Sequence, residues 1–322
     1  MTPYFKTNLG TLYCGDCLEV MREMPENSIQ TCVTSPPYWG LRDYGVDGQL
    51  GLEKTPEEYV SKMVEIFQEV KRVLHNDGTL WLNLGDSYAV SGRGLMGDGT
   101  PSDRGNAKQG TNRGTTVGQF NKITWDGLKP KDLVGIPWRV AFALQADGWW
   151  LRQDIIWHKP NPMPESVKDR CTKAHEYIFL LSKNKRYYYD ANAIKEPVAE
   201  SSIKRLSQPT LVDQQGSDRV PGKTNGPMKA VGNLSGRNRR SVWTITTKPF
   251  KKAHFATFPE KLIEPCILAG ASEDSIVLDP FFGAGTTGIV SERFRRKWIG
   301  IEMNEEYCEI AKNRIKSKFM WV

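Results

Sequence analysis

The sequence predicts an α/β fold in which strands from both ends of the chain form one parallel sheet, with helices on both of its faces. Residues 27–84 show a strand, a helix and a second strand, which is the unit of a parallel sheet. Residues 275–301 repeat this pattern, with a glycine-rich turn between the first strand and the helix. Only 34 residues follow Gly288, which is too few to complete a large sheet. The remaining strands must therefore come from the N-terminal part.

The first unit begins with a β-branched strand at 27–34, which ends at the turn Ser35-Pro36-Pro37-Tyr38. The following helix has three signals of its start. Thr55 can act as the cap, Pro56 suits the first helical position, and Glu58 completes a capping box. Apolar residues then recur at helical spacing, which predicts one long amphipathic helix.

Asn76-Asp77-Gly78 is expected to end this helix, and residues 79–84 are expected to form the next strand. Residues 85–118 hold nine glycines in 34 residues and many polar side chains, which is typical of a long functional loop. We expect this loop to be mobile. The globular pattern then resumes with one helix and two strands, at 137–144, 149–158 and 175–181.

The positive charge of the chain is concentrated in residues 193–252. This stretch has twelve basic residues and four acidic ones, an excess of eight charges, whereas the whole 322-residue chain has a net charge of +7. A basic segment is often no more than a solvated surface. Because the entire surplus lies in one fifth of the chain, we instead expect a separate region that meets a polyanion.

The second unit contains a glycine loop after the strand at 275–278. Gly283, Gly285 and Gly288 fit the pattern G-x-G-x-x-G, which allows a ligand to approach the backbone closely. Glu302 ends the next strand, where its carboxylate can accept hydrogen bonds from both hydroxyls of a ribose. The elements expected around the loop are a helix at 260–268, a helix after the glycines, a strand at 298–301 and a final helix.

The glycine loop alone fits a nicotinamide dinucleotide about as well as any other nucleoside. Two features count against the dinucleotide: the short remainder of the chain, and Asp279-Pro280 before the glycines. A carboxylate at that point would lie where a pyrophosphate otherwise sits. It suits instead a cationic group, such as the amino group of an aminoacyl-type cofactor.

The turn Ser35-Pro36-Pro37-Tyr38 is stiff, because each proline fixes its own φ and holds the preceding residue extended. The Ser35 hydroxyl and a proline carbonyl can accept the two hydrogens of an amino group on a planar base. Tyr38 can stack on the ring of that base. Such a turn can also be a rigid loop at a sheet edge. It indicates a binding function only together with the glycine loop.

Together, the turn and the loop resemble the S-adenosylmethionine-dependent amino-methyltransferases of DNA, in the permuted arrangement called the β group. In that arrangement a [DNS]-P-P-[YFW] turn comes first, a target-recognition region follows, and the cofactor loop lies near the C-terminus. The resemblance covers nearly the whole chain. It implies a permuted Rossmann-like methyltransferase sheet in a discontinuous catalytic domain, 1–192 and 253–322, and a small basic target-recognition insertion at 193–252.

The resemblance also assigns site residues. The catalytic ones are Ser35, Pro36, Pro37 and Tyr38. The segment Leu12–Leu18 resembles the one whose acid lies near the cofactor adenine, and His254–Leu262 resembles the one that closes over the methionine part. The implied cofactor-binding residues are Asp16, Thr257, Phe258, Asp279, Phe281, Gly283, Gly285, Thr286, Thr287 and Glu302. The implied DNA-binding residues are Lys223, Arg237, Arg239, Arg240, Lys251 and Lys252.

The implied reaction is methyl transfer from S-adenosyl-L-methionine to a flipped base, without a metal. Its partners would be double-stranded DNA and a cognate restriction endonuclease. In this family, Ser at the first position of the turn usually accompanies methylation of cytosine at N4. Methylation of adenine at N6 on the same fold stays open. An NAD-dependent oxidoreductase and a non-catalytic DNA-binding protein are more distant alternatives.

The six cysteines do not form a disulfide framework or a four-ligand zinc pattern. Cys14 and Cys17 form a C-x-x-C pair that we interpret as two small buried thiols. Cys266 follows a proline, as the nucleophile of a C5-cytosine methyltransferase does, but it lies in an amphipathic pattern and is expected in the core. The longest apolar runs are too short to cross a bilayer. We expect a soluble, cytoplasmic, nucleoid-associated protein.

Overall fold

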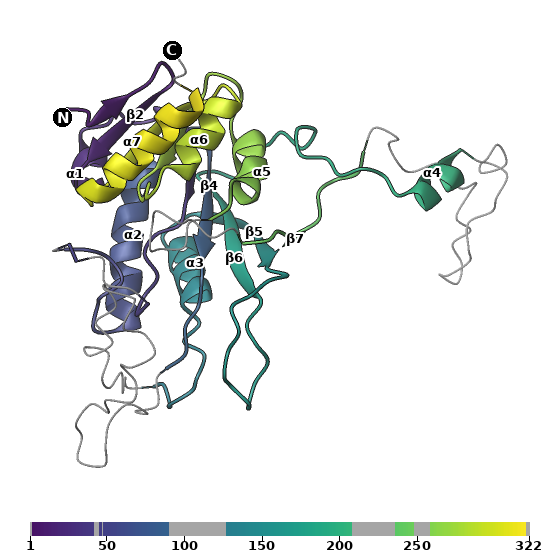
Figure 1. Ribbon diagram of the computed structural model, residues 1–322, viewed down its shortest axis with the longest axis horizontal. Helices are drawn as coiled ribbons and strands as arrows, with labels where there is room; N and C mark the ends of the chain where they lie inside the picture. Colours follow the sequence, from purple (N-terminus) through teal and green to yellow (C-terminus); the bar gives the residue numbers. More distant parts are fainter. Residues whose placement is uncertain are drawn as a thin grey trace. The chain divides into compact units, whose positions relative to one another are not determined.

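The computed structural model describes residues 2–41, 45–46, 48–89, 127–207, 236–247 and 258–319. It contains two compact units, Met1–Tyr189 with Ser241–Val322, and Asp190–Arg240. In the described part of the larger unit, nine strands form one sheet in the order β1-β2-β9-β8-β3-β4-β6-β5-β7 (Figure 1). In chain order they are β1 Phe5–Lys6, β2 Gly10–Cys14, β3 Ile29–Thr34, β4 Leu74–Leu84, β5 Trp150–His158, β6 His175–Ser182, β7 Val242–Thr244, β8 Ile276–Asp279 and β9 Lys297–Glu302.

The centre of the sheet is parallel and combines both ends of the chain. β9 pairs with β2, and β8 pairs with both β9 and β3, always in parallel. The prediction that N-terminal strands complete the C-terminal unit is therefore confirmed. β1 and β6 run the other way, each paired antiparallel with its neighbours.

Helices cover both faces of this sheet (Figure 1). Successive residues of a strand point to opposite faces, and β4 shows this directly. Leu80 and Leu82 join the core formed with the helices that precede and follow β4, whereas the Trp81 ring lies against Gly270. One layer consists of α1 (Cys17–Arg22), α2 (Pro56–Val73) and α3 (Ile136–Ala146), and the other of α5 (Glu260–Gly270), α6 (Thr286–Arg293) and α7 (Glu305–Phe319).

The start of α2 follows the sequence signals. Thr55 Oγ1 accepts a hydrogen bond from the Glu58 amide at 3.1 Å, and Pro56 occupies the first turn. The Glu58 carboxylate accepts from the Lys54 amide, one residue before the cap. The predicted end at 76–78 is wrong: α2 ends at Val73 and β4 begins at Leu74. Leu74 is fully buried and extended, so the chain enters the sheet at once, and the polar residues that follow lie at an irregularity of the β3–β4 register.

A second core lies between β9, α6 and α7. Phe282 and Trp298 stack there, with ring centroids 5.1 Å apart. The Phe282 ring lies directly over Gly300 in β9, and a Cβ at Gly300 would lie 2.4 Å from it. This close contact seats the loop that follows β8 onto the sheet.

The smaller unit contains α4 (Glu200–Leu206) and a short backbone pairing between Glu196 and Arg237. The Glu196 carboxylate also forms ion pairs with Arg237 and Arg240, at 3.3 and 3.2 Å. The region expected to recognise the target, 193–252, overlaps this unit over 193–240. β7, which lies inside that expected region, is a strand of the large sheet and pairs with β5.

Gly300→Ala should lower the free energy of unfolding by about 1–3 kcal/mol, because a methyl group there overlaps the Phe282 ring and forces the core apart. Urea denaturation measures this. The same substitution should cost less in a Phe282→Leu background, where the smaller side chain leaves room. Equal costs in the two backgrounds would contradict the packing described.

Candidate active site

The carboxyl ends of β2, β3, β8 and β9 meet at one edge of the sheet, because these strands are parallel. The polar residues selected from the sequence follow these ends: Asp16 after β2, Ser35 after β3, Asp279 at the end of β8 and Glu302 at the end of β9. Ligands of open α/β sheets bind outside the carboxyl ends of their strands. This edge is therefore the candidate active site.

Asp279 ties together three segments at this edge. Its carboxylate accepts hydrogen bonds from Thr34 Oγ1 and Thr287 Oγ1, both at 2.6 Å, and from the Phe281 amide at 3.1 Å. The residue is 1% exposed. Burial raises its pKa to about 6, and the three hydrogen bonds oppose that shift. The carboxylate thus joins the end of β3, the turn after β8 and the first turn of α6.

The glycine loop needs its glycines for two different reasons. Gly283 and Gly285 have φ of +50° and +79°, which side chains other than glycine rarely adopt. Gly285 also precedes α6 at its N-terminus, where a Cβ would lie 2.9 Å from the Ala311 side chain. The loop is therefore held tightly against α7 while its other side stays open to the cavity.

Glu302 faces the glycine loop from the end of β9. Its two carboxylate oxygens accept from the Gly283 amide at 2.8 Å and the Asn304 amide at 2.9 Å. Burial raises its pKa to about 6, while the backbone hydrogen bonds oppose the shift. Each oxygen accepts one of these bonds and keeps a lone pair that a ligand hydroxyl can use.

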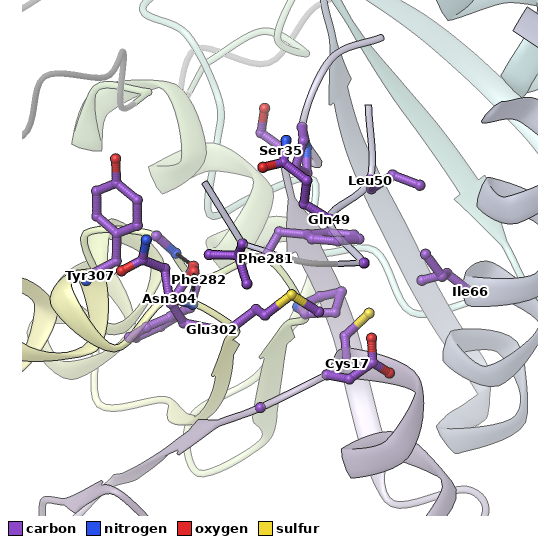
Figure 2. Close-up of a pocket in the computed structure, with 18 of the residues that line it drawn as sticks. Cys17, Ser35, Gln49, Leu50, Ile66, Phe281, Phe282, Glu302, Asn304 and Tyr307 are labelled. Carbon is purple, nitrogen blue, oxygen red and sulfur yellow. Dashed lines mark hydrogen bonds between the residues drawn. The ribbon is translucent and has the colours of Figure 1, made fainter. Parts of the chain in front are cut away.

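A cavity of about 330 Å³ lies between these segments. Figure 2 shows Ser35 at the top of this pocket, Glu302 and Asn304 at the left and Cys17 at the lower right, with Phe281 between them. Of the residues predicted from the sequence, those that line it are Asp16, Ser35, Pro37, Phe258, Phe281, Gly283, Thr286 and Glu302. The predicted catalytic and cofactor-binding residues that the structure describes outside the lining are Pro36, Tyr38, Asp279, Gly285 and Thr287.

Direct contact between Asp279 and a cationic ligand group was expected from the sequence and stays a prediction. The structure uses both oxygens of this carboxylate inside the protein. Arg237, Arg239 and Arg240 lie in the smaller unit. Thr257, Lys223, Lys251 and Lys252 lie outside the described residues, as does most of the expected loop at 85–118.

Asp16 begins α1 as its cap. Its Oδ1 accepts from the amides of Leu18 and Glu19, at 2.9 and 3.0 Å. Burial and the neighbouring Asp16 raise the pKa of Cys17 to about 12, so this thiol stays protonated at neutral pH. Cys266 is buried in α5 and contacts the Leu262 carbonyl, which confirms the expected core position.

The turn after β3 is anchored from two sides. The Tyr59 hydroxyl of α2 donates to the Pro37 carbonyl at 2.9 Å. The Tyr38 ring lies against Gly85, where a Cβ would be 2.5 Å from the ring. Ser35 and Pro37 line the cavity, whereas Tyr38 does not.

Several residues that line the cavity were not expected from the sequence. Lys62, Glu65 and Ile66 belong to α2, whose helical pattern indicated only a core-facing stripe. Others come from the segment before α2 and from the start of α7, namely Val46, Gly48, Gln49, Leu50, Asn304 and Tyr307. Only their position beside the predicted turn and the predicted acid could have suggested them.

Comparison with known proteins identifies the family of this chain. The family model described as DNA methylase, which covers N6 and N4 enzymes, matches residues 29–313. The chain belongs to this family. The Type II methyltransferase M.Cfr9I of Citrobacter freundii is 47% identical over 311 residues, which are 97% of this chain and 89% of that protein. This DNA methyltransferase thus matches its relative along nearly its full length.

Solved structures confirm the methyltransferase fold. PvuII DNA methyltransferase, which is cytosine-N4-specific, superimposes with a TM-score of 0.62 at 22% identity, covering 98% of this chain and 93% of its own. A Thermus thermophilus protein described as a putative DNA modification methylase, complexed with S-adenosyl-L-methionine, gives 0.56 at 21% identity, with coverages of 95% and 94%. At these identities the likeness concerns the fold alone.

The described residues contain no group of three or more His, Cys, Asp or Glu side chains placed to hold a metal ion. None of the helices within the described ranges has both the length and the hydropathy needed to cross a bilayer.

Thr287→Val removes one donor from the buried Asp279 carboxylate and should cost about 1–3 kcal/mol of unfolding free energy at pH 7.5. Because the pKa of Asp279 in the folded protein is about 6, the group is charged at pH 7.5 and mostly protonated at pH 5. The loss should therefore be smaller at pH 5. Thr287→Ser keeps the hydroxyl and serves as the control in urea denaturation at both pH values. A loss that is the same at both pH values would contradict this role.

Proposed function

We propose that this enzyme transfers a methyl group from S-adenosyl-L-methionine to the exocyclic N4 of cytosine in duplex DNA, at a specific sequence. One observation carries the proposal. The neutral hydroxyl of Ser35 lies in the wall of the same cavity that Glu302 and the glycine loop line. A hydroxyl at this position suits the amino group of cytosine, and the cytosine-N4 specificity of PvuII DNA methyltransferase supports the same choice.

The residues around the cavity fit the methyl donor. Glu302 has lone pairs for the ribose hydroxyls, and Gly283 leaves the backbone open to close approach. Asp16 and Phe258 both line the cavity, and the family resemblance implies that Asp16 lies near the adenine and Phe258 near the methionine part. S-adenosyl-L-methionine supplies an electrophilic methyl group on a sulfonium.

The protein's own contribution is positioning. An exocyclic amino group is a weak nucleophile, because its lone pair is delocalised into the ring. Hydrogen bonds from its two N–H groups to the Ser35 hydroxyl and the Pro36 carbonyl favour a pyramidal nitrogen with a directed lone pair. Fixed acceptors of this kind lower the barrier through orientation and electrostatic stabilisation, and no covalent enzyme intermediate is needed.

The base must leave the duplex before it reaches Ser35, which costs a few kcal/mol. Stacking on the Tyr38 ring, at roughly 1–3 kcal/mol per base, offsets part of this cost. In this proposal the basic region at 193–252 contacts the DNA through its arginines and lysines. The partner implied by this proposal is a cognate restriction endonuclease, because the DNA sequence that such an enzyme cleaves would need protection by methylation.

The product identifies the reaction. The purified protein is incubated with S-adenosyl-L-methionine and unmethylated genomic DNA, and the nucleosides are analysed by mass spectrometry. The proposal predicts N4-methylcytosine. N6-methyladenine would contradict the choice of base while keeping the family, whose model covers both reactions. The absence of any methylated base would contradict the proposed activity.

Ser35→Ala should lower kcat by about 10²-fold, because it removes one fixed acceptor from the transition state. Calorimetry should show an unchanged affinity for S-adenosyl-L-methionine, since the loop and Glu302 are untouched. Ser275→Ala is the control, because that hydroxyl bonds only to Ser272 among the described hydrogen bonds. An unchanged kcat for Ser35→Ala would remove Ser35 from the catalytic role.

A further inference from the structure

A chain of polar side chains leads from Ser35 away from the cavity and into the sheet. Ser35 Oγ donates to the Tyr38 hydroxyl at 3.3 Å. The Tyr38 hydroxyl lies 2.9 Å from Glu176 Oε2 and 3.2 Å from Asn83 Oδ1. Glu176 belongs to β6 and Asn83 to the neighbouring strand β4. This series of hydrogen bonds therefore connects the proposed catalytic turn to two strands that are far from it in the sequence.

Glu176 is held firmly in place. Its Oε1 bonds to the Lys159 ammonium, which also lies over the Trp157 ring, 4.2 Å from the centroid. Its Oε2 lies 3.4 Å from Asn83 Nδ2, and that amide also donates to the Tyr177 carbonyl at 3.0 Å. The Glu176 side chain is 17% exposed, and that of Lys159 is 18% exposed. Both carboxylate oxygens therefore have fixed partners.

The number of hydroxyl hydrogens in this series of side chains determines which group donates each hydrogen bond. Tyr38 has one hydroxyl hydrogen, and burial together with the nearby Glu176 charge raises its pKa, so the hydrogen stays in place. A carboxylate is a stronger acceptor than an amide oxygen, so Tyr38 donates to Glu176. Its oxygen is then the acceptor for the Ser35 hydroxyl. Ser35 has no other hydrogen bond among the described residues, so its lone pairs face the cavity without a hydrogen.

We propose that Glu176, held by Lys159, is a positioning residue that orients the Tyr38 and Ser35 hydroxyls so that Ser35 acts only as an acceptor toward the target amino group. This inference rests on the proposed function and adds the direction of the catalytic hydrogen bond to it. A serine hydroxyl can otherwise turn its hydrogen toward the substrate, which would oppose the amino N–H groups. The charge that prevents this lies two hydrogen bonds away from Ser35.

Glu176→Gln tests the proposal, because it keeps the size of the side chain and removes its charge. The remaining amide turns its oxygen to Lys159 and its NH₂ to Tyr38, so the Tyr38 hydrogen loses its charged acceptor and is shared between Asn83 Oδ1 and Ser35 Oγ. We expect kcat to fall about tenfold or more, equivalent to about 1.4 kcal/mol in the barrier. The Kd for S-adenosyl-L-methionine should stay within about twofold, because Glu176 does not line the cavity. Glu69→Gln is the matched control, since Glu69 is 23% exposed and pairs with Arg72 at 2.9 Å in α2.

A double-mutant cycle with Tyr38→Phe distinguishes a positioning role of Glu176 from a merely structural one. This substitution keeps the ring and removes the hydroxyl. If Glu176 acts through Tyr38, the double variant will be no slower than Tyr38→Phe alone. Losses that multiply, or a wild-type kcat for Glu176→Gln, would overturn the proposal. If Glu176→Gln no longer binds the cofactor, Tyr38→Phe alone decides: a wild-type kcat overturns the proposal and a loss of tenfold or more supports it. An inactive wild-type enzyme in the same assay would instead refute the proposed function.

Discussion

The buried carboxylate of Asp279 is the interaction on which the rest of this site depends. It binds Thr34, which lies 245 residues earlier in the chain, and Thr287 at the start of α6. Through these bonds the Ser35-Pro36-Pro37-Tyr38 turn after β3 and the glycine loop after β8 are held at fixed positions on adjacent strands. In a permuted chain these two segments are far apart in the sequence, so only a tertiary contact can align them. The cost of burying a charge is offset by three donors, which is the condition under which buried carboxylates are tolerated.

Much of the fold was predictable because the sequence signals were local. The capping residues of α2, the β-branched strand before Ser35 and the glycine loop each depend on neighbours within a few residues. β2 and α1 were not predicted from the sequence. β2 is formed through its pairing with β9, where Trp298 lies over Gly10. The end of α2 was predicted three residues too late, because the burial of Leu74 in the sheet outweighs the turn signal at 76–78.

Site residues that belong to a motif were predictable from the sequence. Residues that approach the site only because distant strands pair in the folded protein were not. Ser35, Glu302 and Gly283 were identified from motifs and lie around one cavity. Asn83, Lys159 and Glu176 were not identified, since each lies in or beside a strand and belongs to none of the motifs. The ring of Tyr38 was expected to stack on a base, whereas the hydrogen bonds of its hydroxyl to β4 and β6 were not expected from the sequence. The proposed site therefore lies at an edge of the sheet formed by strands that are distant in the sequence.

The most direct measurement of the central claim, that one sheet edge holds the methyl donor beside the catalytic turn, is a crystal structure of the protein with S-adenosyl-L-homocysteine. This account predicts that the ribose hydroxyls bind Glu302 and that the sulfur lies on the side of the cavity where Ser35 is found. A ligand whose ribose lies away from Glu302, or whose sulfur is separated from Ser35 by the protein, would contradict it.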